Sequence, residues 1–134
     1  MQKKEIRKTV VHLLKKNFRE VYTNNAFVKN LKESPSVVVS IPNENFELLS
    51  VLPRYSKATI VLKIEILKKQ TLEIEEEIEN ETDKIIKLMT LNNDLLKVLD
   101  SIKLQKIEYD YDAEGDDVVG GSQIIYKLTY TKEG

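Results

Sequence analysis

Carboxylates gather in the segment DYDAEGDD, which spans residues 110–117. Asp110, Asp112 and Glu114 occupy alternate positions, Gly115 follows them, and Asp116 adds a fourth carboxylate. Oxygen ligands at alternate positions before a glycine are typical of the first half of a calcium-binding loop. The chemistry that these residue types offer is coordination of Ca²⁺ or Mg²⁺.

The second half of that loop does not fit the calcium pattern. Gly121 stands at the twelfth position, where a bidentate glutamate is required, and Asp117 stands at the normally apolar eighth position. The flanking residues alternate as strands do, whereas a calcium loop lies between helices. We therefore predict a flexible acidic loop over residues 112–121 and no dedicated metal site, with weak association of Ca²⁺ or Mg²⁺ left open.

No other set of side chains has the spacing of a catalytic or cofactor site. The chain has no cysteine, which excludes thiol catalysis and disulfides. His12 is the only histidine and lies among lysines, so a solvated side chain is the simplest interpretation. Seven carboxylates lie between Glu73 and Asp83, but a helix distributes adjacent residues around its axis, which favours a solvated face. We predict that the protein is not an enzyme and needs no cofactor.

Composition excludes several classes of partner. The 134 residues include 21 basic and 22 acidic side chains, a net charge of −1, so no global charge favours a membrane or sequence-specific nucleic acid. No apolar run approaches the roughly 20 residues of a membrane span, and the first ten residues lack the apolar core of a signal peptide. We expect one domain over residues 1–134, in a protein that stays in the cytoplasm.

The stretch KATIVLKIEIL, residues 57–67, is the element that must organise the fold. Its even positions are all apolar and its odd positions are mixed, which predicts a long central strand with one buried face.

The other elements are predicted from the periodicity of apolar residues and from the turn-forming residues between them. Residues 26–31 are ambiguous, and residues 45–51 either form a strand or cross the sheet. The remaining expected elements are a helix over 3–18, a short strand over 37–41 closed by Pro42, a helix from Thr71 through Lys87, a short helix over 95–102, and a hairpin of strands 107–111 and 124–131. This order predicts an α+β fold, an antiparallel sheet of four or five strands with helices packed on one face.

The layout resembles the tail terminator, or tail completion, proteins of long-tailed bacteriophages. The resemblance runs through the amphipathic first helix, SPSVVVSI, KATIVLKIEIL, the following helices, and the closing pair KIEYDYD and IIYKLTY. It implies a hexameric ring that caps the tail tube, stops its polymerisation and joins the head connector, in the virion tail. The tail tube protein and the head connector protein are the implied partners, and DNA passes through the ring.

Irregular loops carry partner specificity, so the segments around Asn43–Arg54 and Asp112–Gly121 are the expected assembly contacts. The residues singled out are Asn43, Arg54, Asp112, Asp116, Asp117 and Gly121. Two alternatives stay open from sequence. One is another head-tail connector component, such as a head-completion or stopper protein, or a tube-like subunit. The other is a small monomeric ligand-binding α+β module, which requires a pocket with convergent polar groups.

Overall fold

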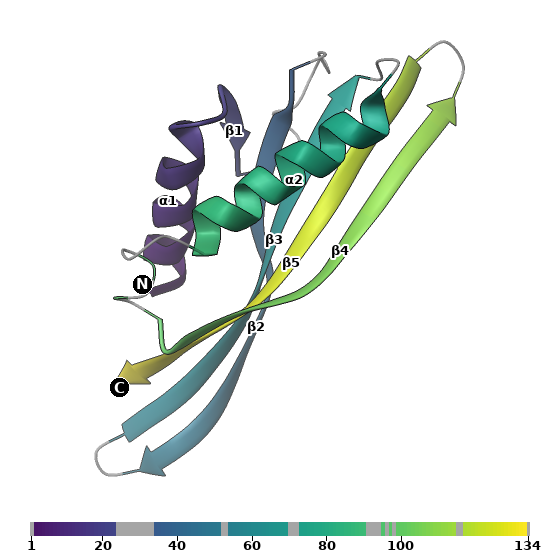
Figure 1. Cartoon of the computed structure of the whole chain (residues 1–134). Coiled ribbons are helices and arrows are strands. Elements are labelled where there is room, and N and C mark those ends of the chain that lie inside the picture. The colour runs from purple at the N-terminus through teal and green to yellow at the C-terminus, as the bar shows by residue number, and fades with distance from the viewer. Residues whose placement is uncertain are drawn as a thin grey trace.

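A computed structural model describes residues 2–23, 34–51, 54–69, 73–90, 95, 97, 99–114 and 117–133. The elements are α1 (Gln2–Lys15), β1 (Glu20–Tyr22), β2 (Ser36–Val51), β3 (Arg54–Lys69), α2 (Ile74–Thr90), β4 (Ser101–Glu114) and β5 (Asp117–Glu133). The five strands form one sheet in the order β1-β2-β3-β5-β4 (Figure 1). All pairs are antiparallel except β1 with β2, which is parallel. The α+β prediction is confirmed, and the sheet is mixed rather than purely antiparallel.

β3 is the middle strand, as its sequence predicts. Its side chains at Ala58, Ile60, Leu62, Ile64 and Ile66 are completely buried. Ile64 lies opposite Val39 of β2 and Ile124 of β5, so three neighbouring strands present apolar side chains on one face. Because side chains alternate along a strand, this register places all the even positions of β3 in the core.

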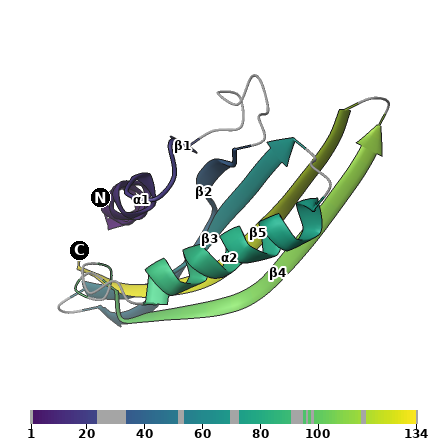
Figure 2. The same ribbon diagram turned by 45° about the horizontal axis from the view of Figure 1, so that its top comes forward.

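Both helices cover that same face (Figure 2). The two predicted helices are present, but α1 ends at Lys15 instead of residue 18, and α2 continues to Thr90 beyond Lys87. The buried stripe of α1 comprises Ile6, Val10, Leu13 and Leu14, and the buried stripe of α2 comprises Ile74, Ile78, Thr82, Ile85 and Met89. Three glutamates lie in the first turn of α2 and Lys87 in its last turn, which complements the helix dipole. Neither of the helices among the described residues has the length and apolar character to span a membrane.

β2 is a single strand of 16 residues, so the prediction of a short strand closed by Pro42 is wrong. Ile41 and Pro42 together oppose one residue of β3, Leu62, in a β-bulge between Ser40 and Asn43. β1 pairs only with Ser36–Val38. Pro42 therefore lies beyond this pairing, on the edge of the sheet, where a residue without an N–H group is tolerated. The segment 45–51, left open by the sequence, continues this strand.

The hairpin of β4 and β5 is much longer than predicted, and the prediction of a loop over 112–121 is wrong. Both strands extend to Glu114 and Asp117, which pair with each other. Gly120 and Gly121 lie where neighbouring atoms leave no space for a side chain, and they do not provide flexibility to a loop. A Cβ on Gly120 would come within 2.5 Å of Ile74 Cγ1 in α2, and one on Gly121 within 2.6 Å of the Ile66 carbonyl oxygen.

Two further boundaries differ from the sequence prediction. Leu95 and Lys97 are helical, but Ile102 belongs to β4, so the short helix does not reach 102. β1 is a strand that the sequence did not predict, and its Glu20 carboxylate accepts a hydrogen bond of 3.0 Å from the Ser36 hydroxyl. The ambiguous segment 26–31 and Thr71 lie outside the described residues.

Replacing Ile64 by alanine tests the central position of β3. The change removes a fully buried side chain between Val39 and Ile124, and we expect it to lower the free energy of unfolding by about 2–5 kcal/mol. Urea denaturation measures the difference. The control Leu49→Ala, at an exposed position of β2, is expected to stay within about 0.5 kcal/mol of the parent protein. Equal effects of the two changes would contradict the assignment.

Candidate assembly surface

Of the predicted contact residues, Arg54 lies at one end of the long sheet, Asp112 and Asp117 lie near the other end, and Asn43 lies midway along β2. Asn43 is exposed beside the first bulge of β2, and Arg54 begins β3 opposite Val51, near the β2–β3 turn. Asp112 in β4 pairs with Val119, and Asp117 in β5 pairs with Glu114, near the β4–β5 turn. Figure 1 shows these turns at the two extremes of the molecule. The fold therefore makes two separate candidate surfaces rather than one.

Gly121 does not lie in the loop that the sequence predicted. Gly121 is buried inside β5, between Leu67 of β3 and Asp110 of β4. Asp116 is outside the described residues. The candidate metal ligands Asp110, Asp112 and Glu114 lie at alternate positions of β4, in an extended strand instead of a loop that wraps around an ion. In the described parts of the chain, no group of three acidic or histidine side chains is placed to hold a metal ion.

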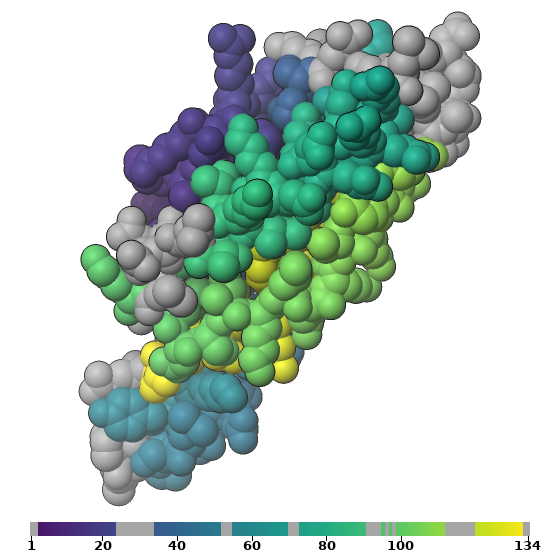
Figure 3. All heavy atoms as spheres, in the orientation of Figure 1, coloured from purple at the N-terminus to yellow at the C-terminus, as the bar shows by residue number. Residues whose placement is uncertain are grey.

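The end of the β2–β3 hairpin carries the main exposed apolar surface of the described residues. We call Phe46, Leu48, Leu49 and Val51 the apolar arm; their exposed fractions run from 51% to 70%. In the space-filling view the hairpin end stands apart from the rest of the molecule (blue, Figure 3). The sequence showed the apolar group but not its exposure, because exposure depends on how far the helices extend over the sheet.

The arm is held by two contacts that cross from β5. The Tyr130 hydroxyl donates a hydrogen bond of 2.9 Å to the Glu44 carboxylate of β2, and the Lys132 ammonium lies 5.3 Å from the centre of the Phe46 ring. Burial and the Glu44 carboxylate raise the pKa of Tyr130 to about 12. These contacts fix the arm in an extended conformation although its apolar side chains are exposed, so the surface is built before any partner arrives.

The outer edge of β2 is open along the arm. β1 covers only Ser36–Val38, and no other strand in the described part of the chain pairs with Val39–Val51 on that side. An unpaired edge presents backbone N–H and C=O groups that can accept a strand from a partner. A second bulge, between Leu48 and Ser50, interrupts this edge within the arm.

A buried cluster of charges attaches α2 to the sheet. The Lys68 ammonium of β3 lies 2.9 Å from Glu77 Oε2 and 3.1 Å from Glu81 Oε1, and the lysine side chain is 5% exposed. Burial disfavours the charge on Lys68, but the two glutamates outweigh it and raise its pKa. Burial raises the pKa of Glu81 more than Lys68 lowers it, and its Oε2 atom is buried without a hydrogen bond among the described residues.

A neutral polar contact completes this attachment. The hydroxyls of Thr82 in α2 and Ser122 in β5 lie 2.8 Å apart in a buried position, and the Thr82 hydroxyl also donates to the Ile78 carbonyl at 2.7 Å. Polar groups buried at a helix–sheet contact cost free energy unless they are paired, so they select one placement of α2.

Comparison with known proteins identifies a family. The family model described as "Phage minor tail protein U" matches residues 1–130 of this chain. None of the curated proteins matches this chain. The match agrees with the resemblance found in the sequence at the level of phage tail proteins.

Replacing Lys68 by methionine tests the charge cluster. The change removes the buried ammonium that Glu77 and Glu81 share, and we expect the free energy of unfolding at pH 7.5 to fall by about 3 kcal/mol. In this variant Glu81 has a pKa above that of the unfolded chain, so protonation favours the folded state. The loss therefore shrinks as the pH falls toward 5, as urea denaturation at both pH values would show.

The matched control also removes the Glu81 carboxylate, which loses its contact with Lys68 in the single variant. Lys68→Met/Glu81→Leu is expected to recover part of the stability and to lose most of the pH dependence, because the carboxylate whose titration produces it is gone. A loss in Lys68→Met that is the same at both pH values would contradict this account.

Proposed function

Since the chain belongs to the phage minor tail protein U family, whose members are structural proteins of the phage tail, we propose that it is the tail terminator. In this role it caps the end of the tail tube as a hexameric ring, stops polymerisation of the tube and provides the surface to which the head connector binds. Its partners are the tail tube protein and the head connector protein. It acts in assembly rather than catalysis, and assembly takes place in the host cytoplasm.

The apolar arm is the observation that carries this proposal. Phe46, Leu48, Leu49 and Val51 follow one another along a strand whose outer edge is open. A protein that works alone rarely exposes several large apolar side chains together, because their burial contributes about 25 cal/mol per Å². The arm has the character of an assembly contact, and we assign it to the end of the tail tube.

A ring accounts for termination as well as for binding. A tube grows because each ring of subunits offers a surface to the next ring. A terminator must match the tube on one face and differ from it on the other. A closed ring of copies gives every tube subunit at the end one partner, and six weak contacts then add up to stable capping. The surface near the β4–β5 turn, at the far end of the sheet, is then left for the head connector (Figure 1).

Tube polymerisation with purified components tests the proposal. Adding this protein to growing tubes is expected to bind one tube end and to shorten the tubes, as electron microscopy of their lengths would show. The variant Phe46→Ser/Leu48→Ser removes two side chains of the arm without touching the core. We expect its capping affinity to fall by at least about tenfold, which corresponds to about 1.4 kcal/mol.

The control uses an exposed apolar residue outside the arm. Leu104→Ser, on β4, is expected to cap as well as the parent protein. Tubes that grow to full length with saturating protein would refute the terminator assignment. Faster nucleation of tubes would instead support a tube-like subunit.

A further inference from the structure

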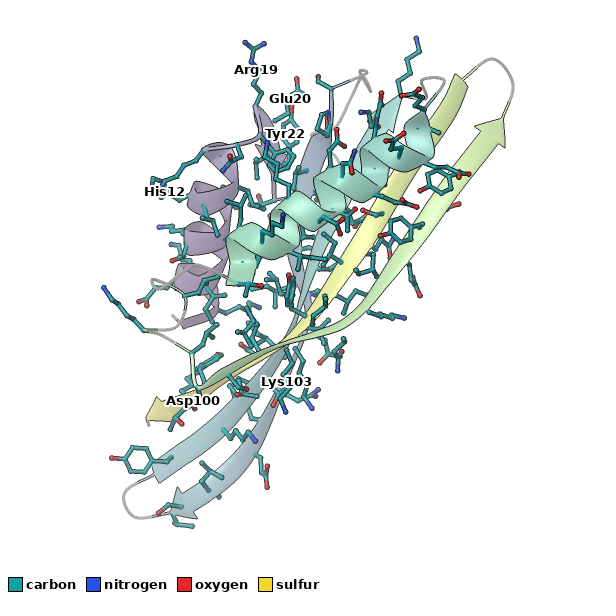
Figure 4. The ribbon with its side chains drawn as sticks, in the orientation of Figure 1. His12, Arg19, Glu20, Tyr22, Asp100 and Lys103 are labelled. Atoms are coloured by element: carbon teal, nitrogen blue, oxygen red, sulfur yellow. The ribbon has the colours of Figure 1, made fainter. Side chains whose placement is uncertain are left out.

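The outer side of α1 carries a stripe of basic side chains. Lys4, Lys8 and His12 recur every fourth residue, and Arg7 and Lys15 lie beside them. With Val11 and Thr23 these five residues line a shallow hollow of about 330 Å³. Figure 4 shows His12 on the side of α1 that faces away from α2. No ion pair of the described residues involves this basic stripe.

The exposed side of α2 carries an acidic stripe with the same spacing. Glu75, Glu79 and Asp83 also recur every fourth residue, all are exposed, and none takes part in an ion pair with another described residue. Glu77 and Glu81 are turned toward Lys68 and do not belong to the stripe.

Two tyrosines of β4 border the acidic stripe. Burial raises the pKa of Tyr109, and the charges of Asp83 and Glu79 raise it further. Tyr111 is affected in the same way by burial and then by Glu79 and Glu75. The ring of Tyr109 is 43% exposed, so the stripe combines carboxylates with an aromatic face, a surface suited to lysine and arginine side chains.

The two stripes lie at opposite edges of the molecule. The basic hollow includes Thr23, which directly follows β1, whereas the acidic stripe borders β4. β1 and β4 are the outermost strands of the sheet, on opposite sides. A contact between the two stripes therefore joins different surfaces of successive copies.

Like charges repel each other within each stripe. Like charges four residues apart destabilise a helix by about 0.2–0.5 kcal/mol per pair. Both stripes repeat every fourth residue, a rise of about 6 Å, so the charges of one can lie opposite those of the other along their whole length. Contact with a stripe of opposite charge removes the repulsion in both helices at once.

We propose that the basic stripe of one copy binds the acidic stripe of the next copy, and that this contact builds the ring. The inference rests on the proposed function, because it assigns the contact between the ring's subunits. The two surfaces differ and lie at opposite edges, so the contact is head-to-tail, and repeated head-to-tail contacts form a ring where the rotation between copies closes. The arm on β2 stays free for the tube.

Charge reversal tests the contact. One variant, Lys4→Glu/Arg7→Glu/Lys8→Glu, has two acidic stripes, because only Lys15 of the stripe's basic residues remains charged, and another, Glu75→Lys/Glu79→Lys, has two basic stripes. Light scattering at low ionic strength and over a wide concentration range is expected to show assembly of the parent protein toward six times its 15.5 kDa mass, reversed by about 0.5 M salt. Each variant alone is expected to assemble at least about tenfold more weakly.

An equal mixture of the two variants is the decisive measurement. Every contact between unlike variants again joins opposite charges, so the mixture is expected to assemble with the copies alternating around the ring. The control Lys103→Glu/Lys127→Glu also reverses basic charges, at two exposed, paired positions of β4 and β5, and is expected to assemble like the parent.

The outcomes separate this inference from the proposed function. A parent protein that stays monomeric at every concentration overturns the stripe contact, as does a mixture of folded variants that fails to assemble. Parent and variants that form equal rings overturn the stripe contact and leave the ring in place. Assembly through the stripes without any effect on tube length overturns the terminator assignment and leaves the contact standing.

Discussion

The register of β3 between β2 and β5 is the constraint on which the rest of the structure depends. Every even position of β3 from Ala58 to Ile66 is fully buried, and its neighbours across the strands are mostly apolar as well. A slip of one residue would turn Lys63 and Glu65 into the core, so the register is strongly specified. Both helices pack on this face of the sheet because its apolar side chains must be shielded from water.

The placement of α2 depends on residues whose roles cannot be recognised from the sequence alone. Gly120 leaves room for Ile74, while Lys68 and Ser122 provide polar partners for Glu77, Glu81 and Thr82. These contacts turn one side of α2 toward the sheet and leave Glu75, Glu79 and Asp83 on the other. The buried charge cluster thereby determines which carboxylates are available to another molecule. Internal stability and the proposed contact between copies are thus linked through a single helix.

The helices cover only part of the sheet, and the uncovered part carries the apolar arm. The arm, the basic stripe and the acidic stripe point to different neighbours, which matches a subunit that must contact both its own copies and another protein. The division between apolar and charged surfaces has a physical reason. Apolar contacts give affinity that salt does not weaken, whereas complementary charges give a contact its specificity and orientation.

The sequence alone determined the α+β class, the central strand and the two main helices, because periodicity over ten or more residues reports a buried face directly. It also identified the apolar segment after Asn45. Only the tertiary structure decided that Pro42 lies within a strand, since a bulge on an open edge tolerates proline. It likewise decided that Gly120 and Gly121 lie in β5, and so removed the expected acidic loop. The separation of the charged stripes to opposite edges arises from strand order, which no local pattern encodes.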